Sequence, residues 1–145
     1  MQWLELRYGL LCCAAAMGMT TVEVSAADIS VSDAEQLLSV LKSAKGGERI
    51  LLAPGNYGRF QLSANEQPWS KFASRVTIES ANSGEPAIFS SVALTGVQNL
   101  QFDRVKFDYV FAPSDKPHSN AVSIQDCSDI GISSSVFDGD NVRGT

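Results

Sequence analysis

Short pairs of apolar residues, separated by one residue, recur after residue 47 and constrain the fold more than any other feature of the sequence. The pairs are Ile50/Leu52, Val76/Ile78, Leu100/Phe102 and Ile130/Ile132. The second members of successive pairs lie 26, 24 and 30 residues apart. So regular a spacing is typical of a solenoid, in which each repeat buries its apolar side chains against the repeats beside it.

Two segments, residues 94–108 and 124–138, show the repeat most clearly when they are aligned at an offset of 30 residues. Their apolar positions then coincide: Leu94 with Ile124, Val97 with Cys127, Leu100 with Ile130, Phe102 with Ile132 and Phe107 with Phe137. The alignment predicts coils of three short strands, with Cys127 as a small inward residue. The polar segment 111–120 contains two prolines and is expected to form an outward loop inserted into one coil.

The segment from Ser32 to Ala44 predicts the one helix of the chain. Its apolar residues follow helical spacing at Ala34, Leu37, Leu38 and Leu41. We expect Ser32 and Glu35 to form a capping box at the start of the helix, and Gly46 to end it.

The first coil is expected to begin directly after this helix. Residues 50–52 would form its first strand, Pro54 and Gly55 its corner, and residues 57–62 its second strand. A solenoid has an open end, where unpaired strand edges and apolar side chains invite aggregation. The apolar stripe of the helix is therefore expected to cover that end.

The N-terminus has the character of a targeting segment. Arg7 precedes an apolar stretch, residues 8–19, that is too short to span a bilayer, and the small residues of 24–26 suit a signal peptidase. Residues 1–26 are expected to be a signal peptide, with cleavage after Ala26 or, alternatively, Ala27. An uncleaved anchor is the other interpretation. Export would leave residues 27–145 secreted or periplasmic, without membrane attachment and with one cysteine, so without an intrachain disulfide.

The charge balance limits the classes of partner. The formal net charge of the chain is −5, which argues against nucleic acid because phosphates require a basic face. An anionic polysaccharide is still compatible, since a local cationic cleft can lie on an acidic protein.

Three stretches carry a resemblance to a known superfamily. They are DAEQLLSVLKSAKGGERILLAPGNYG (33–58), RVTIESANSG (75–84) and NLQFDRVKFDYVF (99–111). They resemble the opening coils of secreted right-handed parallel β-helices of the pectin-lyase-like superfamily. Within it, they are similar to polysaccharide lyases of the alginate-lyase and chondroitinase-B type and to mannuronan C5-epimerases. The resemblance covers residues 33–143 and implies an all-β fold, a right-handed parallel β-helix with an N-terminal capping α-helix.

The resemblance also implies a chemistry. In those enzymes a uronic-acid polymer lies in a groove along one face, its carboxylate is neutralised by Ca²⁺ or a cationic side chain, and a basic residue removes the C5 proton. These groups belong to later coils, so no catalytic residue is carried over to this chain. A Ca²⁺ requirement is implied only for a full-length family member. The helix-GG-x-x-IxLxPGxY arrangement occurs in members with different substrates, so it marks the first coil and not the reaction.

Several residues are candidates for contact with an anionic polysaccharide. Arg104 and Lys106 are expected to alternate on the outward side of residues 102–107 and, with Arg143, to meet a carboxylated sugar, although solvated strand residues would look the same. His118 would act as a base only if its loop folded over a groove.

Two other groups were weighed as binding residues. Asp138 and Asp140 offer oxygens of the kind Ca²⁺ accepts, with a plain turn as the alternative. The aromatic residues Tyr57, Trp69, Phe72 and Tyr109 would either stack on sugar rings or fill corners of the core.

The last residues, 137–145, offer neither a helix nor a closing strand for the far end of a solenoid. We therefore expect the β-helix to be truncated after three to four coils and inactive in this form. A complete small domain that dimerises through its open end is the alternative. For function, a non-catalytic extracellular module that binds a glycan or mediates adhesion is the alternative to a lyase or epimerase, and a chain without activity is a third possibility.

Overall fold

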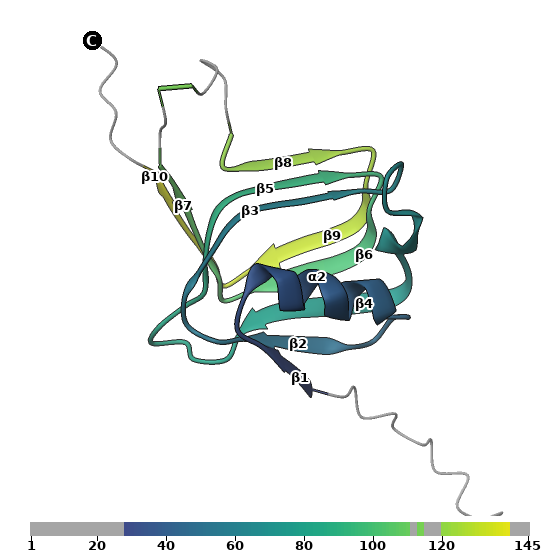
Figure 1. Cartoon of the computed structure of the whole chain (residues 1–145), viewed down its shortest axis with the longest axis horizontal. Coiled ribbons are helices and arrows are strands. Elements are labelled where there is room, and N and C mark those ends of the chain that lie inside the picture. Colours follow the sequence, from purple (N-terminus) through teal and green to yellow (C-terminus); the bar gives the residue numbers. More distant parts are fainter. Residues whose placement is uncertain (1–27, 111–112, 115–119, 140–145) are drawn as a thin grey trace, which may run out of the picture.

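The computed structural model describes residues 28–110, 113–114 and 120–139 (Figure 1). This part of the chain is mostly β-structure, with the α-helix α2 (Ala34–Ser43) and the 3₁₀-helix η1 (Pro68–Ser70). The strands, in chain order, are β1 (Asp28–Val31), β2 (Arg49–Leu52), β3 (Asn56–Ser63), β4 (Lys71–Ser80), β5 (Ile88–Thr95), β6 (Gln98–Asp103), β7 (Lys106–Tyr109), β8 (Val122–Gln125), β9 (Ser128–Ser133) and β10 (Val136–Gly139).

The strands form two sheets in which all the pairings of the described residues are parallel. Sheet A has the order β1-β2-β4-β6-β9, and sheet B has the order β10-β7-β5-β3, with β8 also paired to β5. From β2 onward the chain alternates between the sheets, so that each passage adds one strand to sheet A and then one or two to sheet B. We call these passages repeat 1 (β2, β3), repeat 2 (β4, β5), repeat 3 (β6, β7, β8) and repeat 4 (β9, β10).

The pairing register confirms most of the sequence alignment. Every pair aligned at an offset of 30 within the strands is a neighbouring pair: Leu94 with Ile124, Leu100 with Ile130, Phe102 with Ile132 and Phe107 with Phe137. Cys127 packs against the core, as expected. The first step was wrong by two residues, because Ile50 pairs with Ile78 and Leu52 pairs with Ser80.

The corners between strands repeat at the same offset. Left-handed backbone with positive φ occurs at Gly96 and Asp126, at Asn99 and Asp129, and at Arg104 and Ser134. Only glycine adopts this conformation without a steric cost, so its recurrence at residues with side chains indicates that the surrounding strands impose it.

The expected three strands per coil are present only in repeat 3. Its strands β7 and β8 both pair with the single long strand β5, β7 along Ile88 and Phe89 and β8 along residues 92–95. The segment predicted to be an inserted loop therefore connects two strands that continue one line of sheet B. Residues 111–112 and 115–119 of that segment lie outside the described residues.

The start of helix α2 differs from the predicted capping box by one residue. Asp33, not Ser32, is the N-cap, and its carboxylate accepts a hydrogen bond from the Gln36 amide at 2.8 Å. The side chain of Gln36, not Glu35, reaches back and accepts from the Ser32 amide at 3.0 Å. An aspartate is as good a cap as a serine, so the same two-bond arrangement forms one position later.

The end of the helix was also assigned to the wrong residue. Ala44 is the C-cap, and its amide donates to the carbonyl oxygen of Leu41 at 3.2 Å. Gly46 lies two residues further on, where a Cβ atom would stand 2.5 Å from the backbone nitrogen of Ser74 on β4. Glycine is needed there for this close approach, not to end the helix.

Strand β1 precedes the helix and was not predicted. It pairs with β2 from Asp28↔Arg49 to Val31↔Leu52, so sheet A extends one strand beyond repeat 1. Val31 is buried, and the Tyr57 hydroxyl donates to the carbonyl oxygen of Ala53 at 2.8 Å. The strand at residues 49–52, the corner after it and the strand at 56–63 agree with the prediction for the first coil.

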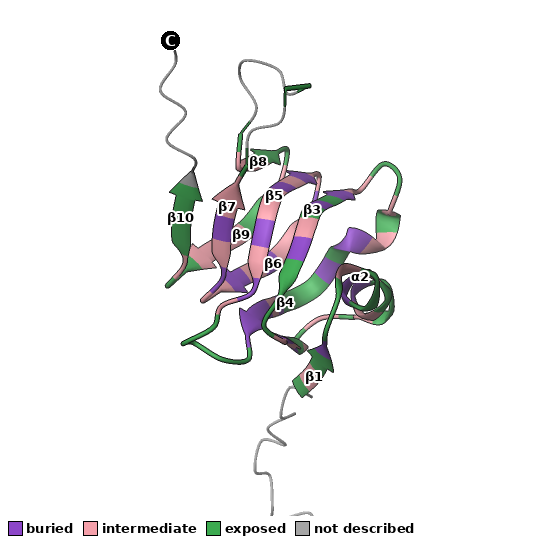
Figure 2. Ribbon diagram, turned by 60° about the vertical axis from the view of Figure 1, so that its left-hand side comes forward, coloured by how far each residue is buried: buried purple, intermediate pink, exposed green. Residues whose placement is uncertain are grey.

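The core lies between the two sheets and is closed by helix α2 (Figure 2). Its centre is a set of aromatic rings at centroid distances of 5.5–6.3 Å, made of Tyr57, Phe60, Phe89, Phe102 and Phe107. Helix α2 contacts β1 of sheet A and β3 of sheet B, and its Leu37 and Leu41 are fully buried. The helix therefore covers the interior at the first repeat, as expected.

Candidate functional site

A row of charged side chains crosses the outward face of sheet A, and we call it the sheet A charge row. It consists of Asp28, Arg49, Glu79, Asp103 and Arg104. Because Ile78 points into the core, the next residue, Glu79, faces outward. It is nevertheless buried, since the arginines of neighbouring repeats cover it.

Glu79 binds both arginines of the row. Its Oε1 accepts from Nη2 of Arg49 and, at 2.8 Å, from Nη2 of Arg104. The hydrogen bond to Glu79 and the charge of that carboxylate raise the pKa of Arg49 above its ordinary value. The two arginines thus serve to neutralise a buried carboxylate, which is a structural role.

Arg104 and Lys106 do not share one strand, contrary to the expectation. Strand β6 ends at Asp103, Arg104 occupies the corner with a φ of 53°, and Lys106 begins β7 in the other sheet. At the corner, Nε of Arg104 also donates to Oδ2 of Asp103 at 3.1 Å. The sheet A charge row contains three carboxylates and two guanidinium groups, so it does not favour a polyanion.

Lys106 forms a second cluster, with Asp108 and Asp138 on sheet B. Its Nζ lies 2.9 Å from Oδ2 of Asp138 and 3.1 Å from Oδ2 of Asp108. The hydrogen bond to Asp138, followed by that to Asp108, raises the pKa of Lys106. The ammonium group is therefore held between two carboxylates of adjacent repeats.

The metal candidates gain no support from the residues that can be seen. Asp138 is paired with an ammonium group, and among residues 28–110, 113–114 and 120–139 no three His, Cys, Asp or Glu side chains gather as metal ligands would. Asp140 lies outside the described residues, as do the other two substrate-binding candidates, His118 and Arg143.

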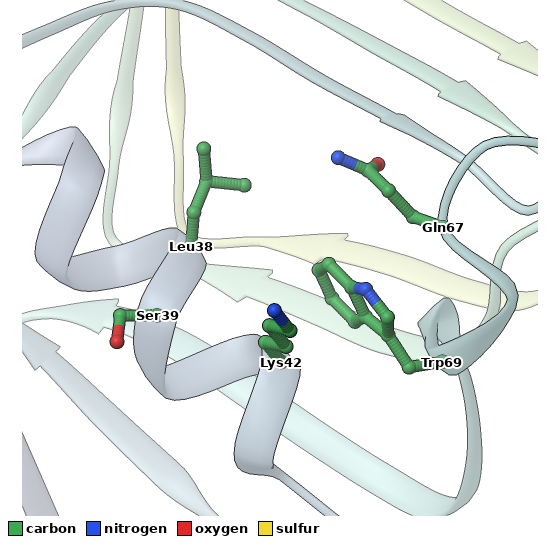
Figure 3. Close-up of a pocket in the computed structure, with 5 residues that line it drawn as sticks. All are labelled: Leu38, Ser39, Lys42, Gln67 and Trp69. Atoms are coloured by element: carbon green, nitrogen blue, oxygen red, sulfur yellow. The ribbon is translucent and has the colours of Figure 1, made fainter.

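A cleft that the sequence did not predict lies between helix α2 and the 3₁₀-helix η1 (Figure 3). Its volume is about 480 Å³. It is lined by Leu38, Ser39 and Lys42 of α2 and by Gln67 and Trp69 at η1. Leu38 and Lys42 are four residues apart and so lie on one face of the helix, opposite the indole ring.

The lining of this cleft combines apolar and polar groups. Leu38 and Trp69 are half-buried and pack against the core, whereas Ser39 and Lys42 are exposed. The side-chain oxygen of Gln67 accepts from the Ser63 amide at 3.1 Å, and its amide nitrogen points toward the cleft (Figure 3). Indole, aliphatic carbon, ammonium, hydroxyl and amide groups thus meet at one place.

The aromatic candidates divide between core and surface. Tyr57 and Phe72 are buried, as core residues, while Trp69 and Tyr109 are only half-buried. The sequence signal for Trp69 was the Pro-Trp pair after a polar stretch, since proline favours the first turn of a helix. Nothing local in the sequence placed this residue opposite Lys42.

Comparison with protein-family models, with curated proteins and with solved structures gave no match to this chain. Function is therefore inferred from its own residues. Neither helix of the described segments combines the length and the apolar character needed to cross a bilayer.

Proposed function

We propose that the chain forms the first coils of a right-handed parallel β-helix and belongs to an exported protein that acts on a uronic-acid polymer, as a lyase or a C5-epimerase. The observation that carries the proposal is the repeated parallel register. Partner residues of sheet A lie 28, 24 and 30 positions apart in successive steps. Such stacking gives flat flanks on which outward side chains of adjacent repeats lie in rows.

These outward rows are rich in polar groups. On sheet B, Ser63 pairs with Thr95 and Thr95 with Gln125. On sheet A, the Gln101 amide donates to the Ser133 hydroxyl at 2.7 Å. Rows of hydroxyl and amide groups along a flank suit an extended polysaccharide better than a compact ligand. The signal-like N-terminus and the resemblance to pectin-lyase-like proteins favour the same class of substrate.

The repeats described here supply binding surface and not reaction chemistry. Removal of the C5 proton of a uronate requires a base and a positive charge that stabilises the developing enolate. Arg104 and Lys106 are each held by two carboxylates, so neither charge is available for a sugar carboxylate. We assign no catalytic residue to this part of the chain.

The second candidate is a non-catalytic extracellular glycan-binding module. The neutralised cations favour it, and so does the cleft at Trp69, because both allow binding without proton transfer. Under this proposal the protein retains a polymer but never changes it.

Incubation of the purified protein with alginate, pectate and chondroitin sulfate tests both candidates. A rise in absorbance from unsaturated products indicates a lyase, and a change in uronate composition by proton NMR indicates an epimerase. Retardation in an affinity gel without either change indicates the binding module. If none of the three polymers is bound or altered, the proposed function is overturned.

A further inference from the structure

The cleft between α2 and η1 stands apart from both charged clusters and from the outward rows of the sheets. Its walls come from segments about 30 residues apart in sequence, the cap helix and the connection between β3 and β4. Pro68 lies in the first turn of η1, and the Gln67 side chain is fixed by the Ser63 amide. Two lining groups are therefore held in place by the backbone around them.

The dimensions and lining fit a single sugar ring. A volume of about 480 Å³ lies within the range of small-molecule sites. The CH face of a pyranose stacks on an indole ring, and Leu38 offers an aliphatic surface facing it. Ser39, Lys42 and Gln67 provide hydrogen-bond donors around this apolar centre.

The charge of the cleft indicates which sugar. Lys42 is the one charged residue of the five that line the cleft, and it is exposed at the rim. An ammonium group makes a charge-assisted hydrogen bond with a carboxylate, which is stronger than its bond with a neutral hydroxyl. A hexuronate would use both the indole face and this ammonium group.

We infer that this cleft is a binding subsite for one uronate residue of an acidic glycan, with Trp69 as the stacking platform and Lys42 as the carboxylate partner. The inference rests on the proposed polysaccharide-directed function and names a site for it at the capped end of the stack. The site holds substrate and has no part in bond cleavage.

The fluorescence of Trp69 reports occupancy directly. The chain has two tryptophans, Trp3 and Trp69, so a Trp3→Phe chain carries the signal from the cleft alone. We expect saturable changes on titration with tetramers of galacturonate or mannuronate, and weaker binding of the same tetramers after reduction of their carboxyl groups. Absence of any saturable change with all four probes would overturn the inference.

Lys42→Gln tests the carboxylate contact without removing packed side-chain volume. We expect about tenfold weaker binding of the acidic tetramers, equivalent to loss of one charge-assisted hydrogen bond, and little change for the reduced ones. Lys45→Gln is the matched control, since Lys45 is also exposed but does not line the cleft. Equal weakening by both variants would mean a general charge effect and would contradict a site at Lys42.

Trp69→Phe separates stacking from packing, because it keeps an aromatic ring against the helix. With unfolding curves confirming that the variant folds, we expect weaker retention of the acidic polymer in the affinity gel. If polymer is bound or altered as before by both Trp69→Phe and Lys42→Gln, this inference fails and the proposed function stands. If the tetramers bind at Trp69 while no polymer is altered, the site stands and the lyase or epimerase proposal fails.

Discussion

Inward positions of repeats 2 and 3 are sealed, whereas the positions that align with them in the last strands are open. Phe107 on β7 is 0% exposed and its neighbour Phe137 on β10 is 60% exposed, although their rings stack at 4.8 Å. Leu94 on β5 is 1% exposed and its neighbour Ile124 on β8 is 45% exposed. The same pattern of residues gives a core only where repeats lie on both sides (Figure 2).

The outward carboxylates show the same contrast. The side chain of Glu79, in the middle of sheet A, is 6% exposed between two arginines. That of Asp138, on β10, is 56% exposed beside Lys106. Position within the stack therefore decides the energetic weight of an ion pair as well as that of an apolar residue.

Truncation of the two stacked phenylalanines tests this contrast most directly. Phe107→Ala removes a ring that also contacts Phe89 and Phe102, and we expect it to lower the free energy of unfolding by about 3–5 kcal/mol. Phe137→Ala removes a mostly exposed ring and should cost less than about 1 kcal/mol. Urea unfolding followed by circular dichroism measures both. Equal losses would show that the open face is covered in solution.

Neutralisation of the two carboxylates has the next largest expected effect. Glu79→Gln leaves two guanidinium groups facing each other without their shared counter-charge, and we expect a loss of about 2–3 kcal/mol. For Asp138→Asn no measurable loss is expected, because the exposed Lys106 keeps Asp108 as a partner. Unfolding at low and high salt measures the pair. A Glu79→Gln chain as stable as the original would contradict a structural role for the sheet A charge row.

Two glycines give a third comparison. At Gly46, where φ is 135°, a Cβ would meet the backbone of Ser74 at 2.5 Å, so Gly46→Ala should cost about 2 kcal/mol or more. At Gly131 a Cβ would meet only the side-chain oxygen of Gln101, which can rotate away. Gly131→Ala should then cost about 1 kcal/mol at most, for the lost Gln101–Ser133 hydrogen bond. Thermal unfolding ranks the two, and the reverse order would disprove the explanation from backbone contact.

The sequence predicted the register of repeats 2 to 4 because their inward positions are all apolar. It failed between repeats 1 and 2 because Ser80 occupies the inward position beside Leu52. The Ser80 hydroxyl accepts from the Ala87 amide at 2.9 Å, so a polar residue is tolerated there and the apolar pair is displaced by two positions. Strand β1 was missed since its short DISV sequence shows no apolar pair.

The candidate site was less predictable than the fold. Arg104 and Lys106 were identified as charged outward residues, but their carboxylate partners lie on neighbouring repeats, and the sequence gives no distance between them. The cleft depends on how helix α2 packs beside η1, which is a tertiary contact between segments with no shared pattern. Local periodicity fixes which side chains face inward, whereas sites formed between elements require the packed structure.

The smallest effect concerns the junction between the cap helix and repeat 1, and it depends on pH. The Glu48 carboxylate accepts from the amides of Lys45 at 2.9 Å and Gly46 at 2.8 Å. Burial alone would raise the pKa of Glu48, but the hydrogen bonds from the Lys45, Glu48 and Gly46 amides lower it below its ordinary value of 4.5. A lowered folded pKa means that the charged form stabilises the fold above pH 4.5 and that this contribution is lost as the pH falls through the folded pKa.

Glu48→Gln should therefore lower the free energy of unfolding by about 1 kcal/mol at pH 7 and have little effect at pH 3, where the original chain has lost the same contribution. Glu85→Gln, at an exposed loop position, is the control and should stay within about 0.5 kcal/mol of the original chain at pH 7. Urea unfolding at several pH values measures the difference. If Glu48→Gln cost as much at pH 3 as at pH 7, the loss would come from packing and not from the carboxylate. The junction would then be held by shape alone, and the sealed first repeat would owe its closure entirely to the apolar stripe of α2.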